Sequence, residues 1–156
     1  MTEVTQATEL AVRMHTDPGE LARLVVTVGA TRAETLANCS YQDRDSTVVL
    51  LITDDPVQSS AVLRAASYQV KTNAVVLVRA LYKPELAARL GARLAEAGIG
   101  ILYSYVSWSE GHRACLVFKT TDDEYAVNLL RTEMLVCDVA RERSVAPRPE
   151  QEQAAA

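Results

Sequence analysis

The chain has 156 residues, enough for one domain or two small ones, and 49% of them are apolar, which allows a substantial hydrophobic core. Its formal net charge of −4 argues against binding to nucleic acid or to anionic membrane surfaces. The first residues are polar and no segment approaches the roughly 20 apolar residues of a membrane span, so we expect neither a signal peptide nor a membrane anchor. Three cysteines without CxxC pairing indicate reduced, buried thiols in a cytoplasmic protein: Cys39, Cys115 and Cys137.

The first predicted strand runs directly into a helix. Apolar and more polar residues alternate over 10–15, which is typical of a strand. Asp17 then suits the N-cap of a helix, Pro18 suits its first position, and Glu20 completes a capping-box pattern with Asp17. The predicted helix ends at Gly29 and has apolar residues at helical spacing: Leu21, Leu24, Val25 and Val28.

The residues that follow complete a first unit. They predict strands at 34–41 and 47–52 joined by a polar hairpin connection, a second helix that begins after Asp54 and Asp55, and a short strand at 68–71. The strand at 47–52 is a near-continuous apolar run, which is typical of a strand covered on both faces. The resulting order is βαββαβ, which is ferredoxin-like.

The same order of elements is predicted a second time. Its members are a strand at 74–80, a helix opened by Lys83-Pro84-Glu85 and closed by Gly98, strands at 99–108 and 113–119, a helix after Thr121-Asp122-Asp123, and a strand at 134–139. The helix-opening prolines, Pro18 and Pro84, lie one such unit apart. Internal duplication of this kind indicates two copies of one module.

A strand followed by Asp17-Pro18-Gly19-Glu20-Leu21 at the start of an amphipathic helix resembles the ACT domain, a small regulatory module that binds amino acids. In the second copy, residues 98–107 also resemble the second strand of that family. The resemblance is greatest to stand-alone tandem ACT proteins, which have two modules and no catalytic domain. It implies an α+β fold in which two ferredoxin-like βαββαβ modules, at 8–72 and 73–140, lie side by side in one continuous antiparallel sheet with helices on one face. The tail at 141–156 is rich in Pro, Gln and Ala, and we expect it to be disordered.

The resemblance implies a ligand site at the loop before the first helix, near the boundary between the modules. Gly19 would expose bare backbone N–H groups to a ligand carboxylate at the positive end of the helix dipole. Asp17 either caps the helix or faces the ligand's ammonium group. We expect His15 to be a surface or interface residue, because no nucleophile with a supporting acid is legible near it. The expected ligand-binding residues are His15, Thr16, Asp17, Pro18, Gly19, Glu20, Leu21, Tyr103, Ser104 and Tyr105.

The second strand of each module should lie at a sheet edge, and the resemblance implies that the two modules pair through these edges. Asn38-Cys39-Ser40 would then lie beside Tyr103-Ser104-Tyr105, and the tyrosines would either contact the ligand or pack between the modules. The second copy has Lys83-Pro84-Glu85, without a glycine or a capping side chain, so a second site there should be weaker. Its expected residues are Asn38, Cys39, Ser40, Tyr82, Lys83 and Pro84.

Two functions follow from these observations. The first is a regulatory protein that binds a free amino acid without a cofactor. The alternative is a ligand-free ACT pair that acts as a dimerisation unit or as the regulatory subunit of a partner enzyme. We expect no catalytic activity, because neither a nucleophile–base pair nor a metal cluster can be read from the sequence. We expect no metal site, because Cys39, Cys115 and His112 lack ligand spacing. The apolar runs at 48–52 and 74–78 need cover on both sheet faces, so we expect a homodimer in which the helix-free faces pack together.

Overall fold

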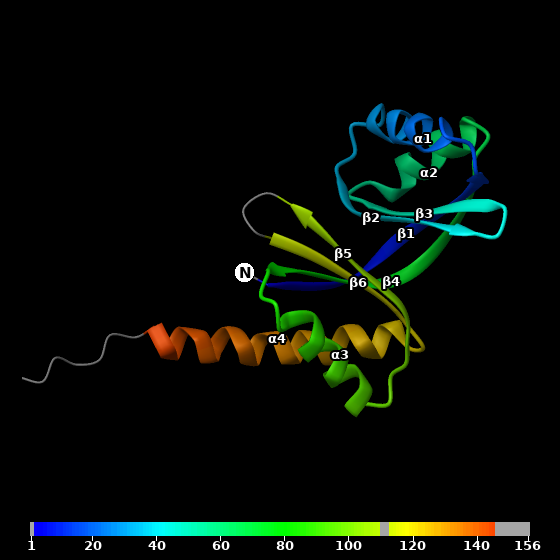
Figure 1. The fold of residues 1–156 in the computed structure, drawn as a ribbon. Coiled ribbons are helices and arrows are strands. Elements are labelled where there is room, and N and C mark those ends of the chain that lie inside the picture. Colours follow the sequence, from blue (N-terminus) through cyan, green and yellow to red (C-terminus); the bar gives the residue numbers. More distant parts are fainter. Residues whose placement is uncertain (1, 110–112, 146–156) are drawn as a thin grey trace, which may run out of the picture.

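The computed structural model describes residues 2–109 and 113–145, with side chains for 2–108 and 113–135 (Figure 1). The described residues form the series βαββα twice. The first series is β1 (Glu3–His15), α1 (Glu20–Gly29), β2 (Thr35–Asp43), β3 (Ser46–Thr53) and α2 (Pro56–Ala65). The second series is β4 (Gln69–Leu81), α3 (Leu86–Glu96), β5 (Ile101–Ser109), β6 (Arg113–Thr120) and α4 (Asp123–Val145).

All six strands belong to one antiparallel sheet, in the order β2-β3-β1-β4-β6-β5. The central strands β1 and β4 have 13 residues each and pair along most of their length, from Glu3 with Arg79 to Arg13 with Gln69. Residues 10–15 of β1 also pair with β3, and residues 76–81 of β4 also pair with β6. Each long strand therefore belongs both to the half of the sheet that contains β2 and β3 and to the half that contains β5 and β6.

The long strands and α4 differ from the elements expected from the sequence. Residues 68–71 and 74–80 were expected as separate strands, but 69–81 form the single strand β4, so the expected module boundary after residue 72 lies inside a strand. No strand forms at 134–139, because these residues continue α4. The place beside β4 that this strand would need is taken by residues 3–9 of β1. Of the expected disordered tail, residues 141–145 also belong to α4, and 146–156 lie outside the described residues.

The helices cover one face of the sheet, as expected. The even-numbered side chains of β1 point to this face along the whole strand: Leu10 and Val12 pack with Leu24 of α1 and Leu63 of α2, whereas Val4 packs with residues of α3 and α4. The helices consequently form two pairs, α1 with α2 near one end of the sheet and α3 with α4 near the other (Figure 1). Each pair covers its own hydrophobic core.

The helix-free face is covered within the chain, because the sheet curls around it. Ile52 of β3, Val75 and Leu77 of β4 and Val117 of β6 form a third buried cluster there, each at most 3% exposed. The apolar runs that predicted a homodimer through this face are therefore satisfied by the chain itself, and this face gives no reason to expect a dimer.

The expected pairing of β2 with β5 does not occur. These strands are the two opposite edges of the sheet, and the halves are joined in the middle, where β1 pairs with β4. The curl nevertheless brings β5 close to β2, although no ladder of backbone hydrogen bonds joins them. The Ser107 hydroxyl accepts a hydrogen bond from the backbone N–H of Asn38 at 3.0 Å and donates one to the Asn38 carbonyl oxygen at 3.1 Å.

Local sequence signals explain where several elements begin and end. Asp55 caps α2 by accepting a hydrogen bond from the N–H of Gln58 at 2.9 Å, and Asp122 does the same for Tyr125 of α4 at 3.0 Å. The chain leaves α3 through Gly98, whose φ of +72° favours glycine, while the N–H of Ile99 bonds the carbonyl of Leu94 at 2.9 Å. None of the described helices has the length and apolar character needed to cross a membrane.

Candidate functional site

The loop between β1 and α1 is a tight turn organised by Asp17. His15 is the last residue of β1 and pairs with Ser46 of β3. The Asp17 carboxylate accepts a hydrogen bond from the N–H of Gly19 at 2.8 Å, and its carbonyl oxygen accepts one from the N–H of Glu20 at 3.0 Å. The helix begins at Glu20 with Gly19 in the N-cap position, so Asp17 stabilises the turn before the helix rather than capping the helix directly.

A cleft of about 710 Å³ opens beside this loop. It lies between the end of β1, the first turn of α1 and the loop from α2 to β4. Three of the expected ligand-binding residues line it, namely His15, Asp17 and Glu20. Its other lining residues, which sequence reasoning did not identify, are Arg13, Met14, Arg23, Ser46, Ala66, Ser67, Tyr68 and Gln69.

The cleft contains charges of both signs at the start of α1. The Arg23 guanidinium forms ion pairs with Glu20, to which Nε donates at 2.9 Å, and with Asp17 at 3.5 Å. The hydrogen bond to Glu20 is the main cause that raises the pKa of Arg23 above its ordinary value. Burial raises the pKa of Tyr68, with a further contribution from the negative charge of Glu20. This arrangement offers a zwitterion partners for both of its charges.

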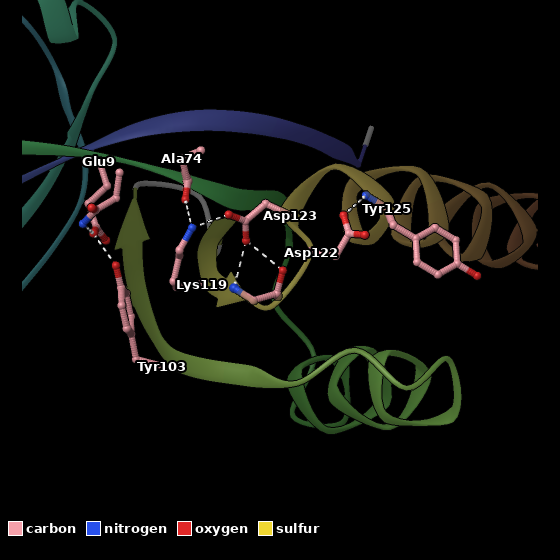
Figure 2. A network of polar contacts seen from close by, with 9 residues as sticks. Glu9, Ala74, Tyr103, Lys119, Asp122, Asp123 and Tyr125 are labelled. Carbon is pink, nitrogen blue, oxygen red and sulfur yellow. Dashed lines mark hydrogen bonds and ion pairs between the residues drawn. The ribbon is translucent and has the colours of Figure 1, made fainter.

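The expected tyrosines lie elsewhere. The hydroxyl group of Tyr103 donates a hydrogen bond to one carboxyl oxygen of Glu9 at 2.5 Å (Figure 2), and that of Tyr105 donates one to the other oxygen at 2.9 Å. Asn73 of β4 donates a third bond to this carboxyl group at 3.1 Å, and Glu9 is fully buried. Glu9 precedes His15 by six positions, about 20 Å along an extended strand, so the structure does not bring Tyr103, Ser104 and Tyr105 to the cleft.

The residues of the expected second site also have separate partners. Asn38 contacts Ser107 of β5, whereas the ring of Tyr82, in the loop from β4 to α3, packs edge-on against Trp108 with centroids 4.2 Å apart. Cys39 and Ser40 lie on β2, and Lys83 and Pro84 lie in the loop with Tyr82. The partners of Asn38 and Tyr82 are thus neighbouring residues of β5, and a second ligand site among these residues stays a prediction.

A second polar network joins β6 to the start of α4. Asp123 accepts hydrogen bonds from the backbone N–H and the hydroxyl of Thr120, at 2.8 Å and 2.7 Å, and forms an ion pair with Lys119 (Figure 2). Lys119 also donates to the carbonyl oxygen of Ala74 at 2.9 Å. Burial acts to raise the pKa of Asp123, but the bonds from Lys119 and Thr120 outweigh it and lower this pKa. The network fixes the first turn of α4 on the sheet.

Two of the three thiols lie in the described part of the chain. Cys115 is buried on the helix-free face, and burial raises the pKa of its thiol; Cys39 is partly buried. Among residues 2–108 and 113–135, whose side chains the structure describes, no group of three or more His, Cys, Asp or Glu residues is placed to hold a metal ion. His112 lies outside the described residues, as does the side chain of Cys137. Among the residues that the structure describes, we take the cleft at the start of α1 as the candidate functional site.

The fold has counterparts among solved structures. The protein BT0572 from Bacteroides thetaiotaomicron matches with a TM-score of 0.74 at 18% identity, over 84% of this chain and 90% of that chain. The regulatory subunits of aspartate kinase from Thermus thermophilus and Thermus flavus match with TM-scores of 0.60 and 0.58, each at 12% identity, over 84% of this chain and 95% of theirs. No protein-family model and no curated protein matches the sequence. Likeness at these identities establishes architecture alone: the chain has an ACT-like fold.

Proposed function

We propose that this protein is a regulatory protein that binds a free amino acid and has no catalytic activity of its own. The ligand binds in the cleft at the start of α1, between Asp17 and the loop from α2 to β4. The observation that carries this proposal is the cleft itself, because carboxylates and a guanidinium meet there at a helix N-terminus. The solved relatives named as regulatory subunits of aspartate kinase support a regulatory role for the same architecture.

The dimensions and chemistry of the cleft suit a small zwitterion. Its volume of about 710 Å³ lies within the usual range of small-molecule sites, roughly 300–1,000 Å³. Asp17 and Glu20 supply negative charge for an ammonium group, whereas Arg23 and the helix dipole supply positive charge for a carboxylate. The polar side chains of Ser67 and Gln69 face the same space and are available to the ligand's side chain.

A thermal-shift screen of the twenty amino acids tests this proposal. A ligand present at 100 times its Kd stabilises the native state by about 2.7 kcal/mol, and for a chain of this size each kcal/mol raises the Tm by roughly 2–4 °C. We expect at least one amino acid to raise the Tm by several degrees in the wild-type protein. The shift should be lost in Asp17→Asn, which weakens the charge of the cleft, and kept in Asp45→Asn, which changes an exposed aspartate in the hairpin between β2 and β3. A screen without any shift would contradict the proposal.

A second candidate function is that of a subunit that binds another protein chain. The observation that favours it is the exposed apolar surface of α1, where Leu21 is 41%, Val25 59% and Val26 73% exposed. A groove of about 370 Å³ between α1 and β2 borders Leu21 and Val25. A homodimer or a complex with a partner enzyme would use this surface, because the helix-free face is buried within the chain.

Light scattering of the wild type and of Val25→Asp tests this second function. A dimer that forms through α1 should dissociate in Val25→Asp, because a charge would be buried without a partner. If the dimer is unaffected by the substitution, or if the wild type is monomeric, the experiment gives no support to this second function, and amino-acid binding is the better account.

A further inference from the structure

We infer that Arg23 receives the ligand's α-carboxylate, and that the ligand's ammonium group replaces the Arg23 guanidinium on Asp17 and Glu20. This inference rests on the proposed function, since it concerns the same cleft. It differs from the expectation drawn from the sequence, in which backbone N–H groups near Gly19 hold the carboxylate.

Two of the backbone N–H groups at the start of α1 are already used. The N–H of Gly19 donates to the Asp17 carboxylate at 2.8 Å, and the N–H of Glu20 donates to the Asp17 carbonyl oxygen at 3.0 Å. A ligand carboxylate would have to compete with both acceptors for these donors. The turn that Asp17 forms therefore occupies these two donors, and a charged side-chain donor beside them would strengthen the binding of a carboxylate.

Arg23 is that donor. It lies one helical turn after Gly19, on the side of α1 that lines the cleft, and its side chain is 61% exposed. Its contacts with Glu20 and Asp17 use Nε and Nη2, so N–H groups on Nη1 remain for a ligand. A guanidinium carries five N–H donors in a planar fork, which matches the two oxygens of a carboxylate.

The ion pairs of Arg23 occupy the charged groups that would bind a zwitterion. In this structure one cation neutralises two carboxylates, those of Asp17 and Glu20. If the guanidinium turns to a ligand carboxylate, the two carboxylates become free to bind the ligand's ammonium group, and every charge keeps an opposite partner. Exposed ion pairs are weak, so this exchange does not require a strong interaction to be broken.

Gly19 provides an independent observation. A Cβ atom at this position would lie 3.3 Å from Nη1 of Arg23 and 3.4 Å from the Asp17 carboxylate. The backbone of Gly19 itself is ordinary, with φ of −90°, so the absence of a side chain is not required by the conformation. Glycine instead leaves room for the guanidinium above the first turn, where it can reach both the carboxylates and the cleft.

A comparison of two ligands and three variants tests the inference. The ligands are the amino acid that binds the wild type most tightly and its α-carboxamide, which keeps the ammonium group and lacks the carboxylate. We expect the wild type to prefer the amino acid at least tenfold by calorimetry. Arg23→Ala should bind the amino acid at least tenfold more weakly, a loss of about 1.4 kcal/mol. It should bind the carboxamide at least as tightly as the wild type does, because the guanidinium no longer competes for Asp17 and Glu20. Arg23→Lys, which keeps the charge without the fork, should fall between the wild type and Arg23→Ala.

The matched control is Arg93→Ala. Arg93 also pairs with a carboxylate three residues away, Glu96 at 3.5 Å, but it lies on α3 and does not line the cleft, so both affinities should be unchanged. If Arg23→Ala retains wild-type affinity for the amino acid, or loses affinity for both ligands equally, the inference is wrong while the proposed function stands. If the wild type binds none of the twenty amino acids, both are wrong. The Tm of each variant without ligand shows whether the fold is intact.

Discussion

Replacing Tyr105 by phenylalanine should destabilise the fold by about 2 kcal/mol, because a hydrogen bond to a buried charged group contributes roughly 1.5–3 kcal/mol. The substitution removes one of three donors to the carboxyl group of Glu9, which is fully buried. Tyr105 itself lies on β5, three strands away from β1 in the sheet order, so its hydroxyl reaches across the helix-free face. The same change should also loosen the curl of the sheet, since one link between β1 and β5 is lost.

Urea denaturation at neutral pH measures this effect. Tyr41→Phe is the matched control: Tyr41 lies on β2, is 49% exposed, and its hydroxyl has no hydrogen-bond partner among the described residues, so its loss should change the stability by less than about 0.5 kcal/mol. In a Glu9→Gln background the cost of Tyr105→Phe should fall, because the charged acceptor is gone. A cost below about 0.5 kcal/mol in the wild-type background would refute the reasoning.

The same tyrosines should make the protein sensitive to alkaline pH. Burial is the first cause that raises the pKa values of Tyr103 and Tyr105, and the nearby Glu9 raises them further. Above about pH 10 the unfolded chain therefore loses tyrosine protons that the folded chain retains, and stability falls by up to about 1.4 kcal/mol per pH unit for each tyrosine. The slope should be smaller in Tyr105→Phe. An identical slope in both proteins would show that this tyrosine does not contribute.

Three further substitutions test other contacts. At neutral pH, Asp123→Asn should lower the free energy of unfolding by about 1–2 kcal/mol through lost hydrogen bonds. Because the fold lowers the pKa of Asp123, this difference should shrink and vanish as the pH falls below 3.8, the ordinary pKa of an aspartate. Urea denaturation at neutral pH and at a pH below 3.8 measures it. Gly19→Val should keep the Tm near that of the wild type and lower amino-acid affinity at least tenfold by displacing Arg23, whereas an unchanged calorimetric affinity would place the ligand elsewhere. Ser107→Ala should cost about 1 kcal/mol in urea, since it removes the bridge to Asn38; no change would mean that the bridge contributes nothing.

Local sequence signals identified most of the elements. The alternation in β1, the apolar run of β3 and the capping aspartates Asp55 and Asp122 each depend on residues close together in the sequence, and the helices and strands formed near these signals. The first nine residues gave no such signal. Thr5, Gln6 and Thr8 are polar, so this part of β1, which is only partly buried, lacks the alternation of apolar and polar residues that marks a strand. Residues 3–9 and residues 134–139 were both candidates for the place beside β4. The choice between such distant segments depends on the whole fold, so no local sequence pattern predicts it.

Some residues of the candidate site could be predicted from local sequence, and others could not. His15, Asp17 and Glu20 could be found because they lie in one loop, and the spacing of Arg23 three residues after Glu20 would have marked an ion pair on the same helix face. Ser67 and Gln69 reach the cleft only because β4 pairs with β1 in the register that sets Gln69 opposite Arg13. The position of Tyr103 and Tyr105 depends on the curl of the whole sheet, which the order of elements does not specify.

The sharing of β1 between the two halves of the sheet has a consequence for the order of folding. Residues 3–9 leave the ribosome before the rest of the sheet, yet their strand partners are residues 73–79 of β4. The half of the sheet that contains β2 and β3 can begin to assemble earlier, whereas residues 3–9 have no strand partner until β4 has been synthesised. Pairing across such a distance in sequence is intrinsically slow. The first segment of the sheet to be synthesised is therefore among the last to be ordered. A chain that lacks residues 3–7 would be synthesised without most of the strand segment that pairs with residues 73–79.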